Sequence, residues 1–193
     1  MIMPSGLRKF TLAIHLSFSV GWIGGVVAYL ALGVAAATTH DPQTLRAAWI
    51  AMDLTGWYAI VPLAVASLLT GLLMALGTKW GLFRHYWVLI SLVLTVIAAG
   101  VLLLHMPDVS ALADAARQAG EISLEGPGGH LYSRLGDGDL LHPALGLAVL
   151  LVIQVLNVYK PQGMTRYGWR KQEEHRKELQ RSKQEQQRGV LQR

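Results

Sequence analysis

The 193-residue chain contains no cysteine. Disulfide bonds, thiolate metal sites, iron–sulfur clusters and covalently attached c-type haem are therefore excluded. Charged residues are also scarce, at 15% of the chain, whereas soluble domains carry roughly 25%. Hydrophobic residues make up 52% of the sequence. So few charges cannot coat a water-soluble globule, and this excludes an ordinary soluble domain.

Four long stretches contain no aspartate, glutamate, lysine or arginine. They are Phe10–His40, Leu54–Thr78, Tyr86–Pro107 and Leu140–Tyr159. About 20 apolar helical residues cross the hydrocarbon core of a bilayer, and each stretch is long enough to do so. We predict an all-α fold, a four-helix transmembrane bundle with spans at about 10–37, 55–78, 85–106 and 140–160. The first stretch exceeds the ~7–15 apolar residues of a signal peptide, so we expect a retained helix.

Basic residues gather on one side of such a bundle. Of the 17 Lys and Arg residues, all but Arg46, Arg117 and Arg134 lie before the first stretch, between the second and third, or after the fourth. Because Lys and Arg near helix ends stay in the cytoplasm, both termini are predicted to be cytoplasmic. The domain prediction is a membrane domain over 1–165, with an outer loop over 107–139, and a charged cytoplasmic tail over 166–193. We expect this tail to be a solvated helix that binds no nucleic acid.

Several local patterns refine this outline. Asp41-Pro42 predicts a helix start in the first outer loop. Residues 108–120 are rich in helix formers and are expected to form a short helix on the membrane surface. Gly21 and Gly25 form a small-xxx-small pair for close helix packing, and Gln154 and Asn157 are expected to pack between helices. Aromatic residues at span ends are expected to be interfacial anchors rather than site residues; they are Trp57, Trp80, Trp87, Trp169, Tyr58, Tyr86, Tyr159 and Tyr167.

Histidines are the ionisable side chains that mark candidate sites, since such groups are costly inside a membrane. With a rise of ~1.5 Å per residue, His105 lies about 14 Å and His142 about 12 Å to the outer side of the span centres. They therefore share a level on different helices. His15 lies about 10 Å to the cytoplasmic side. His85 shares that level but lies about 200° around its helix from His105, so it is the weaker candidate.

Two imidazoles at one depth suit the axial positions of a b-type haem. They also suit copper or zinc, and a histidine that only hydrogen-bonds a neighbouring helix is the alternative to both. Gly146 leaves space beside His142 for a flat macrocycle. Trp22 and Ser91 lie on the inward stripes of their helices and complete the predicted cofactor site. A copper site would add His130 and Met106, with His40 as a weaker candidate and Asp137 and Asp139 as outer-shell groups.

Specific runs of residues carry a resemblance to known families. His15-Leu-Ser-Phe-Ser-Val-Gly-Trp22-Ile-Gly-Gly25 resembles the first-helix signature of the copper-resistance protein D group and of HemJ-type protoporphyrinogen oxidases. Trp87 to His105 resembles their helix that carries a tryptophan and a distal histidine. The runs 80–87, 104–107 and 158–167 resemble an uncharacterised bacterial four-helix integral membrane family, over most of the chain up to about Gly168.

The resemblance implies haem b, with His15 matching the haem-binding histidine, and a bacterial cytoplasmic (inner) membrane location. HemJ-type relatives often carry a lysine at the position of Ser91. This chain lacks that cation, on which their oxidase chemistry or carboxylate binding would depend. In HemJ-type proteins, histidines of the first and third helices form a pair. The depths estimated from the helical rise instead put His15 and His105 at opposite sides of the membrane.

The leading functional hypothesis is therefore a b-type haem protein that performs transmembrane electron transfer or haem-linked redox chemistry. His105 and His142 would ligate an outer haem, and His15 would contribute to a second, inner site. Such a membrane oxidoreductase would work with a redox partner or quinone in the lipid bilayer, alone or as a homo-oligomer. The first alternative is a copper-handling membrane protein. The second is a cofactor-free scaffold whose tail docks a partner.

Overall fold

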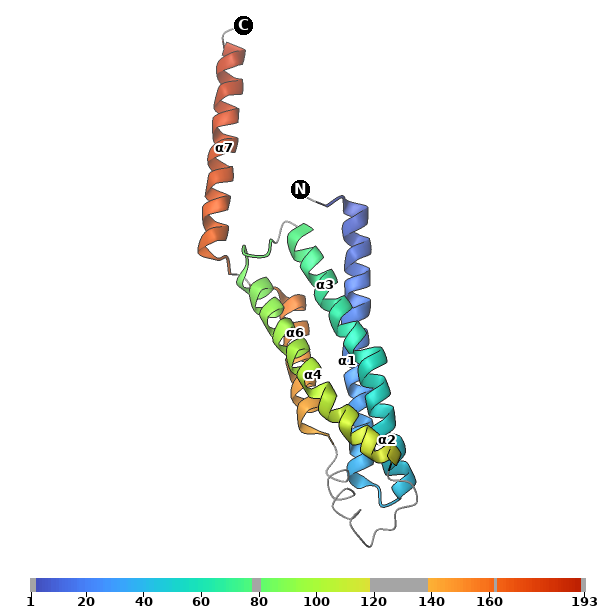
Figure 1. Cartoon of the computed structure of the whole chain (residues 1–193). Coiled ribbons are helices and arrows are strands. Elements are labelled where there is room, and N and C mark those ends of the chain that lie inside the picture. Colours follow the sequence, from blue (N-terminus) through green and yellow to red (C-terminus); the bar gives the residue numbers. More distant parts are fainter. Residues whose placement is uncertain (1–2, 78–80, 119–138, 162, 192–193) are drawn as a thin grey trace.

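The computed structural model describes residues 3–77, 81–118, 139–161 and 163–191, and in these ranges the chain forms helices without a β-strand. Four helical units are long and apolar enough to cross a membrane. They are Ser5–Thr38, Pro42–Gly77, Tyr86–Gln118 and Leu141–Tyr159, and they lie side by side in Figure 1. The all-α fold with four candidate spans is confirmed, and the chain is a multi-pass membrane protein.

Helix α1 (Ser5–Thr38) lies at the centre of the bundle, in contact with α2, α3 and α6. Small residues allow part of this close packing. A Cβ atom on Gly21 would lie 3.3 Å from Leu63, and one on Gly25 would lie 3.2 Å from Ile60. The predicted small-xxx-small pair therefore packs against the second helical unit.

The second unit begins earlier than its predicted span. Helix α2 (Pro42–Thr55) starts where Asp41-Pro42 predicted, and the Asp41 carboxylate accepts hydrogen bonds from the backbone N–H groups of Gln43 and Thr44. A π-helical turn, η1 (Gly56–Ile60), connects α2 to α3 (Val61–Gly77). Gly56 lies close to α4 there, since a Cβ atom would lie 2.5 Å from the end of the Met106 side chain, which would have to shift.

Helix α4 (Tyr86–Gln118) runs through Pro107 without a break in its helical assignment. The helix predicted at the start of the outer segment is confirmed over residues 108–118, but it continues α4 rather than forming a separate surface element. Contacts with α2 explain the extension. Asp53 accepts hydrogen bonds from Ser110 (2.7 Å) and Arg117 (2.8 Å), which fixes the end of α4 against α2.

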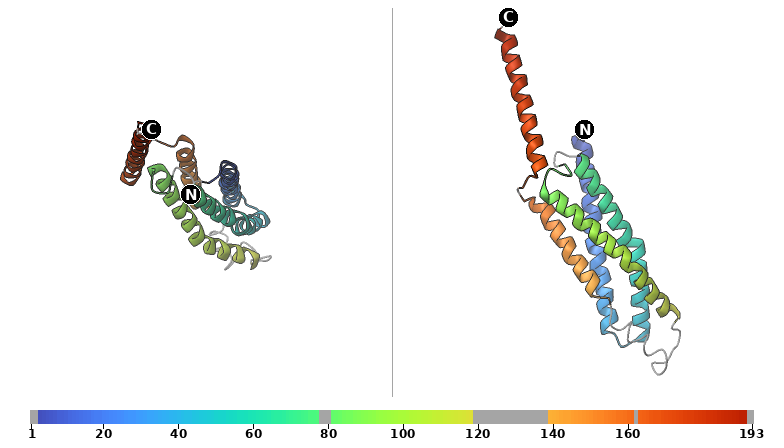
Figure 2. Two further views of the ribbon diagram at one scale, coloured as in Figure 1. Left: turned by 90° about the horizontal axis from the view of Figure 1, so that it is seen from above. Right: turned by 60° about the vertical axis from the view of Figure 1, so that its left-hand side comes forward.

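The last two helices differ in their surroundings. Helix α6 (Leu141–Tyr159) packs against α1 and α4 inside the bundle. Helix α7 (Arg166–Leu191) leaves the bundle and projects beyond it, as Figure 1 and the right view of Figure 2 show. Its side chains from Trp169 to Arg188 are exposed, as expected for a solvated helix. Thr165 caps its start by accepting a hydrogen bond from the Gly168 N–H group.

The tightest packing lies at the end of the bundle farthest from the two termini, here called the distal end (Figure 1). Side chains of α1, α2 and α4 are at most 2% exposed there; they include Ala36, Trp49, Met52, Val109 and Ala116. The opposite, proximal end holds the start of α1 and the end of α6. Apolar side chains cover the outside of the bundle, among them Leu69, Leu104 and Val158, which are 56%, 80% and 65% exposed. Such a surface suits contact with lipid.

Candidate metal centre and second cavity

Three metal-ligating side chains meet at the distal end of the bundle. His105 comes from α4, His142 from the first turn of α6, and Asp139 from the segment directly before α6. One ligand atom of each residue lies within 4.8 Å of the other two. The two imidazole rings stack, with centroids 4.0 Å apart and planes inclined by 17°. The predicted proximity of His105 and His142 is therefore confirmed, while their role as ligands stays a prediction.

Asp139 contacts one ring nitrogen of each histidine. Its Oδ2 atom is 2.6 Å from His105 Nε2, and its Oδ1 atom is 3.5 Å from His142 Nδ1. The carboxylate is buried, whereas the His142 side chain is half exposed. Burial acts to raise the pKa of the Asp139 carboxyl, but the hydrogen bond and charge of His105 outweigh it and lower the pKa. The carboxylate is therefore ionised at neutral pH.

Helix α1 holds Asp139 in place through two residues. The Tyr29 hydroxyl donates a 2.9 Å hydrogen bond to Asp139 Oδ2. One turn further along, a Cβ atom on Gly33 would lie 2.6 Å from the Asp139 carbonyl oxygen. The backbone of Asp139 thus packs directly on α1, and this contact requires glycine at position 33.

A distal cavity of about 280 Å³ adjoins the three side chains. Apart from His105, His142, Asp139 and Tyr29, its walls are apolar. Gly146 lines it with no atom within 4 Å of its would-be Cβ position, in agreement with the predicted free space beside His142. The arrangement can hold a small cation between two imidazoles and a carboxylate.

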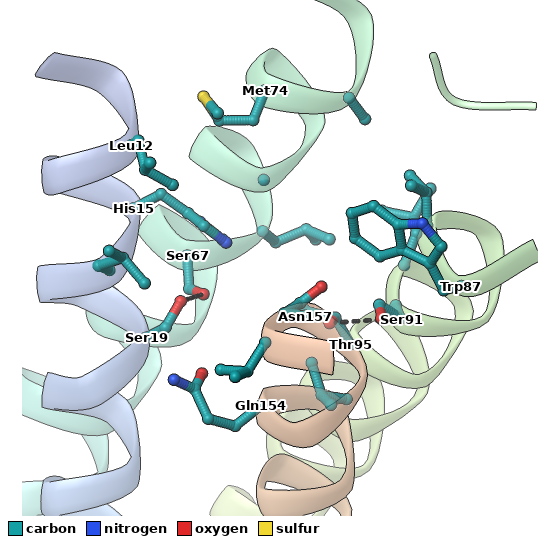
Figure 3. Close-up of a pocket in the computed structure, with 18 of the residues that line it drawn as sticks. Leu12, His15, Ser19, Ser67, Met74, Trp87, Ser91, Thr95, Gln154 and Asn157 are labelled. Carbon is teal, nitrogen blue, oxygen red and sulfur yellow. Dashed lines mark hydrogen bonds between the residues drawn. The ribbon is translucent and has the colours of Figure 1, made fainter. Parts of the chain in front are cut away.

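A larger, proximal cavity of about 490 Å³ lies between α1, α3, α4 and α6. Figure 3 shows His15 and Ser19 of α1 facing Ser91 of α4 and Asn157 of α6 across it. His15 thus lines the proximal cavity and His105 the distal one. The sequence prediction that these histidines lie at opposite ends is confirmed. Trp22 and Leu150 line both cavities and separate them.

Of the other predicted site residues in the described ranges, Met106 lines the distal cavity, whereas His40 and His85 lie apart from both groups. His40 is exposed beyond the end of α1, and His85 lines neither cavity and pairs through its backbone with Met164. Met106 is 1% exposed and packs on Gly56. His130, Asp137 and Trp80 fall outside the described residues.

Two residues at these sites were predicted in other roles. Asp139 was expected to be an outer-shell group, yet it touches both histidines; its position three residues before His142 is the signal, since i and i+3 side chains meet at a helix start. Trp87 was expected to be an interfacial anchor, but it is 9% exposed and lines the proximal cavity. Gln154 and Asn157 line this cavity as well.

A scan against protein-family models found no match for this chain, and searches of curated proteins and of solved structures found none either.

Proposed function

We propose that this protein binds a divalent transition-metal ion, copper(II) most tightly, at the outer face of a bacterial cytoplasmic membrane. The single observation that carries the proposal is the convergence of His105, Asp139 and His142, whose ligand atoms lie within 4.8 Å of one another. The function that follows is metal handling, in which the protein captures the ion from outside and retains it.

The donor set selects the class of ion. Imidazole nitrogen suits copper, zinc, iron and nickel, while a carboxylate disfavours soft copper(I). For a given set of nitrogen and oxygen ligands, copper(II) binds most tightly among the divalent first-row metals. Metal–ligand bonds of about 2.0–2.2 Å place neighbouring ligand atoms roughly 3 Å apart. The three ligand atoms lie within 4.8 Å of one another, so the side chains would have to move closer together to reach that spacing.

The groups around the cluster also suit a metal. Metal ligands are commonly held by outer-shell hydrogen bonds, and Tyr29 supplies one to Asp139. The half-exposed His142 leaves an entry side for the ion. The distal cavity leaves space for a water molecule or another small ligand as a further ligand of the metal.

The predicted outer haem is less well supported by this pair of histidines. Two axial imidazoles stand on opposite faces of a macrocycle and both point at its iron. Rings stacked 4.0 Å apart leave no space for a macrocycle between them. The haem hypothesis stays a prediction, and an absorption spectrum of the purified protein separates it from the metal proposal.

The placement at the outer face rests on the charges. Arg8, Lys9 and the basic helix α7 lie at the proximal end with the termini. Basic flanks favour the cytoplasmic side, so the distal cluster faces outward. A metal ion thus reaches His142 from the outside without crossing the bilayer.

Equilibrium dialysis of the detergent-purified protein against copper(II) and zinc(II) tests the proposal. We expect one tightly bound ion per chain, and copper bound more tightly than zinc. Asp139→Ala and His142→Ala should each weaken copper binding by more than about 100-fold, because they remove a direct ligand rather than an outer-shell partner. His40→Ala, an exposed histidine near the same end, is the matched control and should bind as the wild type does.

Equal copper affinity in wild type, Asp139→Ala and His142→Ala would overturn the proposal. A Soret band that disappears in His105→Ala would replace it with the haem hypothesis. Both outcomes are read from the same protein preparation.

A further inference from the structure

The proximal cavity presents uncharged polar groups inside an apolar bundle. Hydroxyl and amide side chains line it from four helices; they are Ser19, Ser67, Ser91, Thr95, Gln154 and Asn157. No aspartate or glutamate is among its lining residues. Arg8, Lys9 and Lys160 line only the end nearest the termini. Polar side chains inside a membrane span are costly and are functional by default. This polar layer is therefore a candidate ligand-binding site.

Ser91 is the most direct sign of a missing ligand. It is 7% exposed, and its Oγ atom has no hydrogen-bond partner among the described residues. An unsatisfied buried hydroxyl costs free energy that a ligand oxygen would recover. By contrast, the Ser19 and Ser67 hydroxyls bond each other at 2.8 Å. Ser91 thus lines the cavity and carries an O–H donor that has no acceptor among the described residues.

His15 offers the complementary acceptor. The Thr70 hydroxyl donates its proton to the Ala66 carbonyl at 2.6 Å and lies 3.0 Å from His15 Nδ1. Since that proton is used, Thr70 Oγ1 accepts from Nδ1–H, and neutral His15 keeps a lone pair on Nε2. The ring lines the cavity in Figure 3. The cavity thus combines hydrogen-bond donors from α4 and α6 with an acceptor from α1.

Two indoles give the cavity flat walls. Trp22 and Trp87 are 3% and 9% exposed, and both line it. Figure 3 shows the Trp87 ring reaching over the space between α3 and α4. Offset stacking on such rings favours a planar unsaturated ligand.

We propose that the proximal cavity binds the head ring of a quinone. Its carbonyl oxygens accept hydrogen bonds from Ser91 and from the amide of Asn157, and in the reduced form a ring hydroxyl donates to His15 Nε2. A neutral ring suits a polar layer without charges, whereas an ion at this depth is costly. The acyl chain of an anionic amphiphile anchored at Arg8 and Lys9 would leave these donors unsatisfied. The proposal concerns binding alone and does not depend on the distal metal.

The rim of the cavity allows the tail of such a ligand to leave sideways. Leu16 and Val158 belong to the lining and are 44% and 65% exposed. They lie on the apolar outer surface of α1 and α6. A lipid-soluble ligand can therefore enter from the bilayer, with its tail left in lipid.

Quenching of tryptophan fluorescence tests the proposal on the full chain in nanodiscs, with a decyl-substituted benzoquinone as the probe. We expect saturable quenching with one site per chain. Ser91→Ala should weaken binding about three- to tenfold, the usual effect of one lost hydrogen bond. The double variant Ser91→Ala/Asn157→Leu should abolish the saturable component. Ser17→Ala, a serine on the exposed side of α1, is the matched control and should leave binding unchanged.

Three results would overturn the proposal. One is equal quenching in Ser91→Ala, Asn157→Leu and wild type. The second is displacement of the quinone by dodecanoate that requires Arg8 and Lys9, because this identifies an anionic amphiphile. The third is stoichiometric haemin binding that is lost in His15→Ala and blocks the quinone, because this identifies the inner haem predicted from sequence. None of these results alters copper binding at the distal end, so the two proposals are tested separately.

Discussion

The distal and proximal halves of this bundle handle buried polarity in opposite ways. In the distal half, charged groups are paired: Asp139 binds both His105 and Tyr29, and Asp53 binds Ser110 and Arg117. In the proximal half, the polar groups are uncharged, and the Ser91 hydroxyl has no partner among the described residues. Trp22 and Leu150 form the boundary between the two.

Because of this difference in buried polar groups, the two halves suit different ligands. In the distal cluster, a metal cation would replace the proton that His105 and Asp139 share, with the same side chains as its ligands. A layer of neutral groups that includes the unpartnered Ser91 hydroxyl instead suits a ligand that brings its own acceptors. Variants that disturb one half should therefore leave the other half intact.

Among variants that alter no ligand side chain, the largest effect is expected for Gly33→Ala. The added Cβ atom would lie 2.6 Å from the Asp139 carbonyl oxygen, and a backbone atom cannot move away alone. We expect copper affinity to fall by more than about tenfold, with a loss of about 1–3 kcal/mol in unfolding free energy. Dialysis and denaturant titration measure the two quantities.

Gly146→Ala is the matched control for this change, since nothing lies within 4 Å of its would-be Cβ atom. Its copper affinity should equal that of the wild type. Equal affinity in both glycine variants would contradict the packing of Asp139 on α1.

The second effect concerns the paired charges of α2 and α4. Asp53→Ala leaves the Ser110 hydroxyl and the Arg117 guanidinium without their acceptor. We expect the unfolding free energy to fall by about 1–3 kcal/mol, without a change in quinone binding. The control Asp114→Ala breaks only an exposed ion pair and should have little effect. An unfolding free energy in Asp53→Ala equal to that of the wild type would show that the network contributes nothing.

Tyr29→Phe should produce a smaller change within the metal centre. The variant keeps the aromatic ring and removes only the hydroxyl that donates to Asp139 Oδ2. We expect one copper ion per chain with affinity lowered about tenfold, the lower range for an outer-shell partner. Tyr58→Phe, a tyrosine that is 80% exposed, should change nothing. Unchanged copper affinity in Tyr29→Phe would show that the Tyr29 hydrogen bond to Asp139 does not contribute to metal binding.

The smallest effect is a pH dependence at the start of α2. Hydrogen bonds from the Thr44 hydroxyl and from the backbone of Thr44 and Gln43 lower the pKa of Asp41 from its ordinary value of 3.8. Because the folded pKa is depressed, the capping contribution is present above pH 3.8 and is lost as the pH falls through the folded pKa. The NMR shift of the Thr44 amide proton should titrate with a midpoint below 3.8, and Asp41→Asn should abolish that titration. A midpoint above the ordinary value would contradict the cap.

Much of the fold was predictable because apolar length and charge position decide it. Each charge-free stretch overlaps one of the four spanning units, and Asp41-Pro42 marks the start of α2. The extension of α4 to Gln118 was not predictable from Pro107, which usually weakens a helix. Tertiary hydrogen bonds from Ser110 and Arg117 to Asp53 hold this end in place, and their pairing is not visible in the order of residues.

The candidate sites were predictable to different degrees. Depth along a regular helix brought His105 to the level of His142, and the rings do stack. The involvement of Tyr29 was missed, since an inward tyrosine on α1 resembles ordinary packing until Asp139 is placed beside it. The place of Trp87 in the proximal cavity was missed because interfacial anchors are predicted only from their distance to a span end. The direction of its side chain depends on packing against α3.

Electron paramagnetic resonance of the purified protein with one equivalent of copper(II) identifies the nitrogen ligands of the bound metal. We predict nitrogen hyperfine structure from two imidazoles in the wild type, from one in His142→Ala, and an unchanged two-nitrogen signal in His40→Ala. A signal that is identical in wild type, His105→Ala and His142→Ala would contradict the assignment of the distal cluster as the metal site.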